Sequence, residues 1–222
     1  MEQEPHGDGG RRVSAYPLVL TRLDRMGCVV VGGGAVAERK VGELIAGGGR
    51  PSVISPTLTP QLAAWAASGQ IEHHARAYQP GDGAAADLLI AATSNRSVNA
   101  QIAAGAPARC LVNVADDPAA GNMHTVASVR RGDLLLAVST AGRSPSLTAQ
   151  IRRELAAAYG PEYAAIARLF GEWRRRVNHQ LEPEARQEFW RRLRSAVQAG
   201  NAAEFETRAV EIFETLSADL PQ

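Results

Sequence analysis

The stretch that decides the fold is residues 28–40, CVVVGGGAVAERK. The run 27–31 is short and wholly apolar, which is typical of a strand that is buried on both faces of a parallel sheet. Three glycines follow, and residues 35–46 then repeat apolar positions at helical spacing until Gly47-Gly48-Gly49 ends the pattern. The stretch therefore predicts a buried strand, a tight turn with a bare backbone, and a helix.

The same alternation of strand and helix continues along the first half of the chain. Further strands are predicted at 51–55, 71–77, 87–94 and 109–116, and further helices at 58–68 and 96–104. This spacing is typical of a doubly wound α/β domain built on a parallel sheet. We therefore predict a Rossmann-like domain over residues 16–118, preceded by a disordered tail at 1–15.

The pattern changes after Asp117-Pro118. Two short apolar runs, 124–129 and 133–139, flank the turn RRGD and predict a small β connector at 119–145. Ser144 is a good helix N-cap, and Pro145 suits the first helical position. Helices are then predicted at 147–159, 162–178, 184–198 and 202–217. We therefore predict a helical domain over 146–222.

Composition and charge exclude several classes of protein. Hydrophobic residues make up 45% and charged residues 21% of the 222 residues, and the net charge is +1. No overall field therefore favours a membrane surface or nucleic acid. No apolar run approaches the roughly 20 residues of a membrane span, and residues 1–15 lack the apolar segment of a signal peptide. We expect a cytoplasmic protein.

Two residue types that often mark special sites have ordinary explanations here. Cys28 and Cys110 adjoin apolar strands, and no CxxC or Cys/His cluster accompanies them, so we predict buried thiols with no disulfide and no metal site. The arginines of EWRRRVN and FWRRLR alternate with glutamates, and the aromatic residues fall at core spacing. This pattern favours helix packing over nucleic-acid binding.

The glycine turn matches a dinucleotide-binding fingerprint. Gly32-x-Gly34-x-x-Ala37 lies between a strand and a helix, and this is the GxGxxA form of the motif. The first glycine makes the turn, the second lets the backbone approach a pyrophosphate, and the small alanine lets helix and strand pack closely. The helix N-terminus faces the anion. We therefore predict a bound dinucleotide.

The end of the second strand bears on which dinucleotide binds. An acidic residue usually holds the ribose hydroxyls of NAD there, but residues 52–57 read SVISPT, without Asp or Glu. No arginine cluster follows that would favour NADP. Ser55 and Thr57 could bond the ribose, or they could be turn residues that cap the next helix.

Four motifs in this order resemble the precorrin-2 dehydrogenase and sirohydrochlorin ferrochelatase family. They are PLVLTRLDRMGCVVVGGGAVAERKV, AATSNRSVN, LVNVADDP and SVRRGDLLLAVSTAGRSPSLTAQIRREL. In siroheme synthases this N-terminal module oxidises precorrin-2 and often inserts iron. The resemblance covers about residues 16–175. No methyltransferase module follows, so the resemblance implies a stand-alone form.

The resemblance implies NAD as the cofactor. The residues that match the family's NAD site are Gly32, Gly33, Gly34, Ala35, Val36, Pro56 and Thr57. The AAT motif would flank the nicotinamide through Ala92 and Thr93, with Asn95 just beyond them. The family's key carboxylate lies in an NVxD motif, which matches Asn113 to Asp116.

Asp116 is also a catalytic candidate on physical grounds. Ligands of open α/β sheets lie beyond the carboxyl ends of the strands, and Asp116 ends one of them. Dehydrogenation sends a hydride to the nicotinamide and a proton to a base, which a carboxylate can supply. The alternative is a turn-capping role in Asp116-Asp117-Pro118, a common pattern.

The resemblance places the substrate near the second half of the chain. Precorrin-2 carries eight carboxylates, and Arg grips carboxylate through two parallel hydrogen bonds. The candidate substrate-binding residues are Asn113, Arg130, Arg131, Thr140, Gly142, Arg143 and Ser144. Any one arginine, Arg152 and Arg153 included, could instead be a solvated surface charge. Family members commonly carry FxxPA where this chain has MHTVA. His124 is therefore either structural, or an iron-path or proton-transfer residue.

Two other function classes stay open. The chain could be a dinucleotide-sensing module without chemistry, or a different NAD(P)-dependent oxidoreductase. The second class usually shows a Tyr-x-x-x-Lys pair or a catalytic histidine in its second half, and this expectation is not met. Within the favoured interpretation, the enzyme either oxidises precorrin-2 alone or also inserts Fe²⁺. The family also pairs its connector strands across a two-fold axis, which implies a homodimer.

Overall fold

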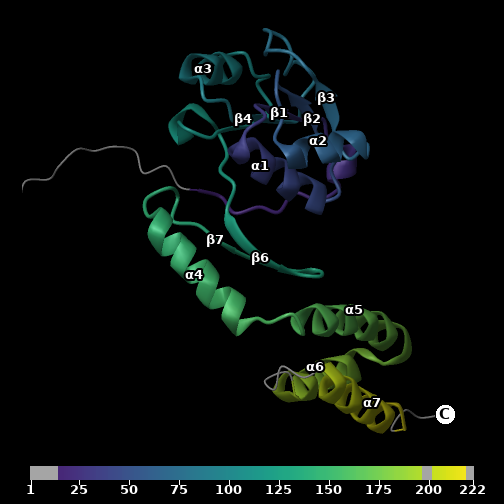
Figure 1. Ribbon diagram of the computed structural model, residues 1–222. Helices are drawn as coiled ribbons and strands as arrows, with labels where there is room; N and C mark the ends of the chain where they lie inside the picture. Colours follow the sequence, from purple (N-terminus) through teal and green to yellow (C-terminus); the bar gives the residue numbers. More distant parts are fainter. Residues whose placement is uncertain (1–14, 197–201, 219–222) are drawn as a thin grey trace, which may run out of the picture. The chain divides into compact units, whose positions relative to one another are not determined.

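The computed structural model describes residues 15–196 and 202–218 (Figure 1). The chain divides after Thr125 into two compact units, each with its own core. We call the first the α/β unit and the second the C-terminal unit. Among the described residues, no helix is long and apolar enough to cross a membrane.

The α/β unit is built on a parallel sheet, so the predicted fold class is confirmed. Its strands lie in the order β3-β2-β1-β4-β5. The strands are β1 (Cys28–Val31), β2 (Ser52–Ile54), β3 (Glu72–His74), β4 (Leu88–Ala91) and β5 (Leu111–Val114). The helices are α1 (Ala35–Ala46), α2 (Pro60–Ala67) and α3 (Arg96–Ala104), with short 3-10 turns η1 (Leu23–Arg25) and η2 (Pro118–Ala120).

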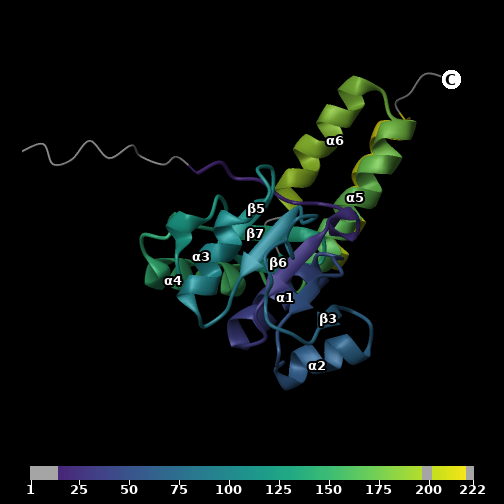
Figure 2. The same cartoon turned by 90° about the horizontal axis from the view of Figure 1, so that it is seen from above.

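Helices cover both faces of this sheet. Figures 1 and 2 show α1 and α2 against one face and α3 against the other. Successive strand residues point to opposite faces, so Ile90 packs with Val41 and Leu62 while Leu89 packs with Ile102. Because both faces are buried, β1 and β4 are apolar throughout, whereas the edge strand β3 consists of Glu72, His73 and His74. The predicted burial of Cys28 and Cys110 as free thiols is confirmed.

Several predicted helices and strands were too long. The predicted helix 58–68 begins at Pro60, because the Thr59 hydroxyl accepts the Leu62 N–H at 3.3 Å and caps it. The predicted strand 71–77 ends at His74, and Arg76 then pairs with Asp82 at 2.7 Å in the turn that follows. The predicted strand 109–116 narrows to β5. In the first two cases, a local side-chain bond lies at or just beyond the changed boundary.

One side chain completes the outer edge of β5. Asn122 accepts the Val112 N–H at 2.7 Å and donates to the Cys110 carbonyl at 2.8 Å. Its own N–H donates back to the Val112 carbonyl at 3.0 Å. Asn122 therefore takes the place of a neighbouring strand along this edge.

A basic residue on the inner face of α1 is buried. Lys40 is 5% exposed, and its ammonium donates to the hydroxyl of Thr125, at the end of the α/β unit. Burial lowers the pKa of Lys40 from its usual 10.5, the charge of Arg39 adds to this, and that of Glu43 opposes it. Folding therefore disfavours the charged form of this side chain.

Replacing Lys40 with methionine should flatten the alkaline pH dependence of stability. The folded pKa lies below the unfolded value, so the unfolded chain binds more protons between the two. The destabilisation is full below the folded pKa and is relieved as pH rises towards 10.5. In chemical unfolding from neutral pH to that value, the free energy of unfolding should rise less for Lys40→Met than for the wild type.

In both the wild type and Lys40→Met, the two cysteines change the free energy of unfolding with pH in the direction opposite to Lys40. Burial raises the pKa of Cys28 and of Cys110 above 9.0, so each loses stabilisation as pH rises beyond that value. The difference between wild type and Lys40→Met cancels this contribution. Equal slopes in the two proteins would show that the Lys40 ammonium is not desolvated on folding.

The C-terminal unit begins with an antiparallel hairpin. Its strands are β6 (Ala127–Arg131) and β7 (Leu134–Val138), joined by a turn with Gly132 at φ 56°. The predicted strand 124–129 was wrong at its start, because β6 begins at Ala127 and His124 lies outside it. Helix α4 packs against both strands of the hairpin. The helices are α4 (Pro145–Ala158), α5 (Tyr163–Gln180), α6 (Pro183–Ala196) and α7 (Ala202–Ala218).

Two predictions for these helices are confirmed. Ser144 caps α4 by accepting the Leu147 N–H at 3.4 Å, with Pro145 in the first turn. The aromatic residues of α5 to α7 form a core in which Trp173, Phe189 and Phe213 are buried. The predicted residues 197 and 198 of the third helix lie outside the described residues.

Candidate active site

The three glycines between β1 and α1 meet different demands. Gly32 has φ 125°, and a Cβ on it would collide with the Ala92 carbonyl. A Cβ on Gly33 would collide with the Thr57 carbonyl. At Gly34, the N-cap of α1, no described atom lies within 4 Å of an added Cβ. The fold therefore requires glycine at the first two positions and leaves open space at the third.

That open space fits the anion expected at a helix N-terminus. Ala35 and Val36 begin α1 behind Gly34, and the Val36 side chain is 47% exposed. Ala37 is buried in the core, where only a small side chain allows close helix–strand contact. Backbone N–H groups at this end can hold a pyrophosphate, so these residues fit a dinucleotide.

The loop after β2 is tied to the glycine turn. Thr59 donates its N–H to the Gly33 carbonyl at 3.0 Å, and the Ser55 hydroxyl donates to the Thr57 carbonyl at 2.8 Å. His73 on β3 donates from Nε2 to the Ser55 carbonyl at 2.9 Å. Ser55 is buried, whereas Pro56 and Thr57 are exposed. Ser55 shapes this loop from inside, and the Thr57 side chain is open to a ligand.

The end of β4 leads into a helix cap. Asn95 accepts the N–H groups of Ser97 and Val98 at 3.0 and 3.3 Å and so caps α3. Its own N–H donates to the Thr93 hydroxyl at 3.1 Å. Asn99, one turn into α3, accepts that hydroxyl at 2.7 Å. Thr93 and Asn95 are thus held in one small network at the carboxyl end of the sheet.

The two adjacent aspartates after β5 differ in their contacts. Asp117 accepts the Ala119 N–H at 3.1 Å and caps η2. Asp116 instead accepts from Asn99 Nδ2 at 2.7 Å through Oδ1, while its Oδ2 lies 3.5 Å from Arg96 Nε. The Asp116 side chain is 30% exposed. Asp117 therefore has the capping role, and the Asp116 carboxylate is turned towards α3.

A small pocket opens beside this carboxylate. Its volume is about 140 Å³. Its lining residues are Arg96, Asn99, Ala100, Val114, Asp116, Asp117 and Ala120. Its walls come from the carboxyl end of β5, from α3 and from η2, which is where ligands of open α/β sheets bind.

Comparisons with known proteins agree with this geometry. A family described as "Putative NAD(P)-binding" matches residues 19–127, and one described as "Sirohaem biosynthesis protein central" matches residues 131–158. Siroheme synthase 1 of Aeromonas salmonicida (strain A449) is 37% identical over 189 residues, which are 84% of this chain and 40% of that protein. Siroheme synthase of Thioalkalivibrio sulfidiphilus (strain HL-EbGR7) is 37% identical over 180 residues, 80% of this chain and 37% of that protein.

A solved structure matches nearly the whole chain. SirC, a precorrin-2 dehydrogenase, superposes with a TM-score of 0.75 at 25% sequence identity, over 92% of this chain and 100% of that one. Over most of its length, the chain is therefore similar to siroheme synthases and to a precorrin-2 dehydrogenase. It spans about 40% of the length of the first curated relative it matches.

Two residues of this pocket were missed in the sequence. Asn99 and Arg96 both reach the Asp116 carboxylate from α3. Asn99 is 1% exposed and falls three residues before the buried Ile102. A polar residue on the buried face of a predicted helix was the available signal, because buried amides need partners.

Asn113, a substrate-binding candidate, lies inside the sheet. It is 5% exposed on β5, and its Nδ2 donates to the Met123 carbonyl at 3.1 Å. Its Oδ1 is buried without a hydrogen-bond partner among the described residues. The side chain therefore helps hold the segment that follows the pocket.

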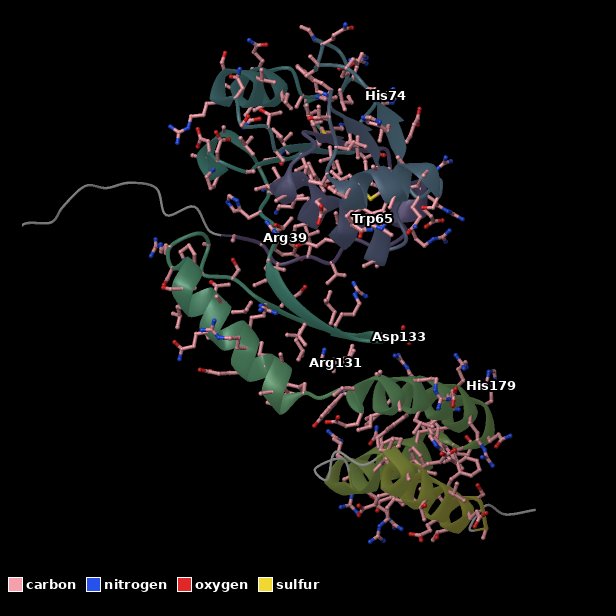
Figure 3. All side chains as sticks on the ribbon, viewed as in Figure 1. Arg39, Trp65, His74, Arg131, Asp133 and His179 are labelled. Carbon is pink, nitrogen blue, oxygen red and sulfur yellow. The ribbon has the colours of Figure 1, made fainter. Side chains whose placement is uncertain are left out.

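The other substrate candidates lie in the C-terminal unit. Arg131 (Figure 3) donates from Nε to the Tyr159 carbonyl at 2.9 Å and from Nη2 to the Ala156 carbonyl at 3.1 Å, so it caps the end of α4. The hydroxyls of Thr140 and Ser144 bond within the first turn of that helix. The residues left open to solvent are Arg130, Gly142 and Arg143, with Gly142 at φ 79°.

Proposed function

We propose that this chain catalyses the NAD-dependent oxidation of precorrin-2 to sirohydrochlorin. The observation that carries the proposal is the Asp116 carboxylate, fixed by Asn99 beside a pocket at the carboxyl end of a sheet whose glycine turn leaves room for an anion. The names of the relatives support it, because they are siroheme synthases and a precorrin-2 dehydrogenase.

The reaction removes two electrons and two protons from the tetrapyrrole. When bound, the nicotinamide accepts one hydrogen as a hydride. The second leaves as a proton, and Asp116 Oδ2 is the carboxylate oxygen to which Asn99 does not donate. Gly34 and the start of α1 would hold the pyrophosphate, Thr57 would bond the ribose, and Thr93 would face the nicotinamide. Substrate, NAD⁺ and enzyme thus yield sirohydrochlorin, NADH and a proton.

NAD is the proposed cofactor in preference to NADP. The loop 55–59 has no basic side chain to bind a 2′-phosphate. Arg76, on the neighbouring strand's exit, is paired with Asp82 at 2.7 and 2.8 Å. Parallel titrations with the two dinucleotides should give the lower Kd for NAD.

The substrate carboxylates would bind to Arg130, Arg143 and the first turn of α4. Gly142 and the hydroxyl groups of Thr140 and Ser144 open that turn, and a helix N-terminus favours anions. Arg131 would contribute less, because its guanidinium already donates to backbone carbonyls.

Anaerobic incubation of the protein with precorrin-2 and NAD⁺ tests the function. We expect NADH absorbance to grow together with the spectrum of sirohydrochlorin, in equal amounts. Dinucleotide binding without any turnover would instead support a sensing module, and turnover of other alcohols or amines would support a different oxidoreductase.

Insertion of Fe²⁺ into sirohydrochlorin is the second candidate activity, which the relatives' name "siroheme synthase" favours. Metal insertion needs a base for the pyrrole N–H protons, and Asp116 is available for this after the oxidation. Among the described residues, no cluster of His, Cys, Asp or Glu could hold a metal ion. Adding Fe²⁺ to the completed oxidation, and comparing the rate with that of Fe²⁺ and sirohydrochlorin alone, separates the two steps.

We further propose a homodimer formed through the β6–β7 hairpin. Val129 and its partner Leu136 share the face on which Val129 is buried, whereas Arg130 and its partner Leu135 share the opposite face. Two strands are too few to bury both faces of the hairpin by themselves. Light scattering at micromolar concentration should give the mass of a dimer, and Leu135→Glu should shift it towards the monomer.

A matched control adds the same charge away from the hairpin. Gln187 lies exposed on α6, so Gln187→Glu should leave the dimer intact. A monomeric wild type, or a Leu135→Glu protein that still dimerises, would show that the hairpin is not the interface.

A further inference from the structure

Asn99 uses every hydrogen-bonding group of its side chain. Its Oδ1 accepts the N–H and the hydroxyl of Thr93 at 3.2 and 2.7 Å. Its Nδ2 donates to the Thr93 carbonyl at 3.1 Å and to Asp116 Oδ1 at 2.7 Å. The chemistry of these partners fixes the amide orientation, because a backbone N–H must face the oxygen and a carboxylate must face the NH₂ group.

The hydrogen bonds of Asn99 hold the Asp116 carboxylate in place, although the packing of α3 does not require a polar residue at position 99. Asn99 is 1% exposed and lies on the buried side of α3, where an apolar residue would pack without any partners. Its donation occupies one oxygen of Asp116. The other oxygen is left for Arg96, 3.5 Å away on an 87% exposed side chain, and for whatever enters the pocket.

We propose that Asn99 is a positioning residue for the dehydrogenation. It holds the Asp116 carboxylate in one orientation and ties it to Thr93, so the proton-accepting oxygen keeps a fixed place relative to the nicotinamide side of the β4 loop. The inference rests on the proposed function, and it adds a residue that acts through Asp116 without touching the substrate's reacting atoms.

Asn99→Asp tests this proposal, because it replaces only the side-chain NH₂ group with an oxygen. The oxygen that Thr93 bonds is kept, but the donor is replaced by an oxygen facing Asp116. We expect kcat for precorrin-2 oxidation to fall about 10- to 100-fold at neutral pH, the usual effect of losing a hydrogen bond to a charged group. The Kd for NAD should change less than about threefold, because Thr93 is still held.

The pH profile separates positioning from a general loss of structure. The two carboxylates of the variant would share one proton, so the acid limb of the kcat profile should move to higher pH. The other charged groups lining this pocket are Arg96 from α3 and Asp117 before η2, and both are unchanged. Gln101→Glu, an equal charge change at an exposed position of α3, should keep the wild-type rate and profile.

A second measurement does not depend on turnover. In ¹⁵N NMR spectra of the wild type, the Asn99 side-chain NH₂ should exchange slowly with solvent, and Asp116→Ala should shift it and speed its exchange. This comparison tests the Asn99–Asp116 contact even if Asn99→Asp does not fold. A wild type that does not oxidise precorrin-2 would overturn the proposed function and the catalytic role of Asn99 with it, whereas the NMR result would still show whether Asn99 holds Asp116. Unchanged NH₂ signals, or an Asn99→Asp enzyme with wild-type kcat and pH profile, would overturn the inference.

Discussion

Asp116→Asn should lower the rate of precorrin-2 oxidation by about 10²- to 10⁴-fold, the usual cost of losing a general base. Asparagine keeps the size of the side chain but cannot take up a proton as a carboxylate does. The amide oxygen of asparagine can still accept the hydrogen bond from Asn99, so the variant should fold, dimerise and bind NAD. Single-turnover NADH formation, alongside a titration of NAD, measures both effects.

Asp117→Asn is the matched control. Asp117 caps η2 through Oδ1, and asparagine is an equally good cap, so this variant should lose little activity. Reversed effects of the two substitutions would assign the base to Asp117. If neither slowed NADH formation, positioning of the substrate by the exposed arginines would be the better account of the rate.

Gly34→Asp should weaken NAD binding by about 100-fold or more. The new carboxylate would occupy the space beside the α1 N-terminus and repel the pyrophosphate, and such like-charge contacts cost several kcal/mol. No described atom lies within 4 Å of an added Cβ, so the fold should be unaffected. Calorimetric titration with NAD measures the Kd, and thermal unfolding checks the fold.

Gly33→Ala should instead destabilise the fold itself. A Cβ there collides with the Thr57 backbone carbonyl, so this variant should lose several degrees of Tm before any question of binding arises. Gly34→Asp should keep the wild-type Tm. If the Gly34→Asp protein bound NAD with wild-type affinity, the dinucleotide would not bind at this turn.

The fold could be predicted because its signals are local. Strands β1 and β4 are apolar over their whole length, and glycines or caps separate the strands from the helices. The errors fall at element ends, where single side chains decide. Thr59 starts α2 two residues later than the apolar pattern suggests, and the Arg76–Asp82 pair follows the early end of β3.

The site could be predicted only in part, because the sequence shows which side chains can bind a ligand but not which ones the chain itself uses. Arg131 reads as a substrate-binding cation, yet it bonds a carbonyl 28 residues away. Asn99 reads as an ordinary helix residue, yet it meets a carboxylate 17 residues away. Both facts follow from the tertiary structure, which brings α4 back to the hairpin and α3 beside β5.

Asn122 has a consequence for solubility. The outer edge of a parallel sheet offers unpaired N–H and C=O groups on which another polypeptide can add as an extra strand, the first step towards ordered aggregates. Here one asparagine side chain and its backbone N–H occupy the groups of Cys110 and Val112 at that edge. Asn122 therefore blocks self-association of the α/β unit through this edge. Its replacement should increase aggregation in concentrated solutions and leave the reaction rate unchanged.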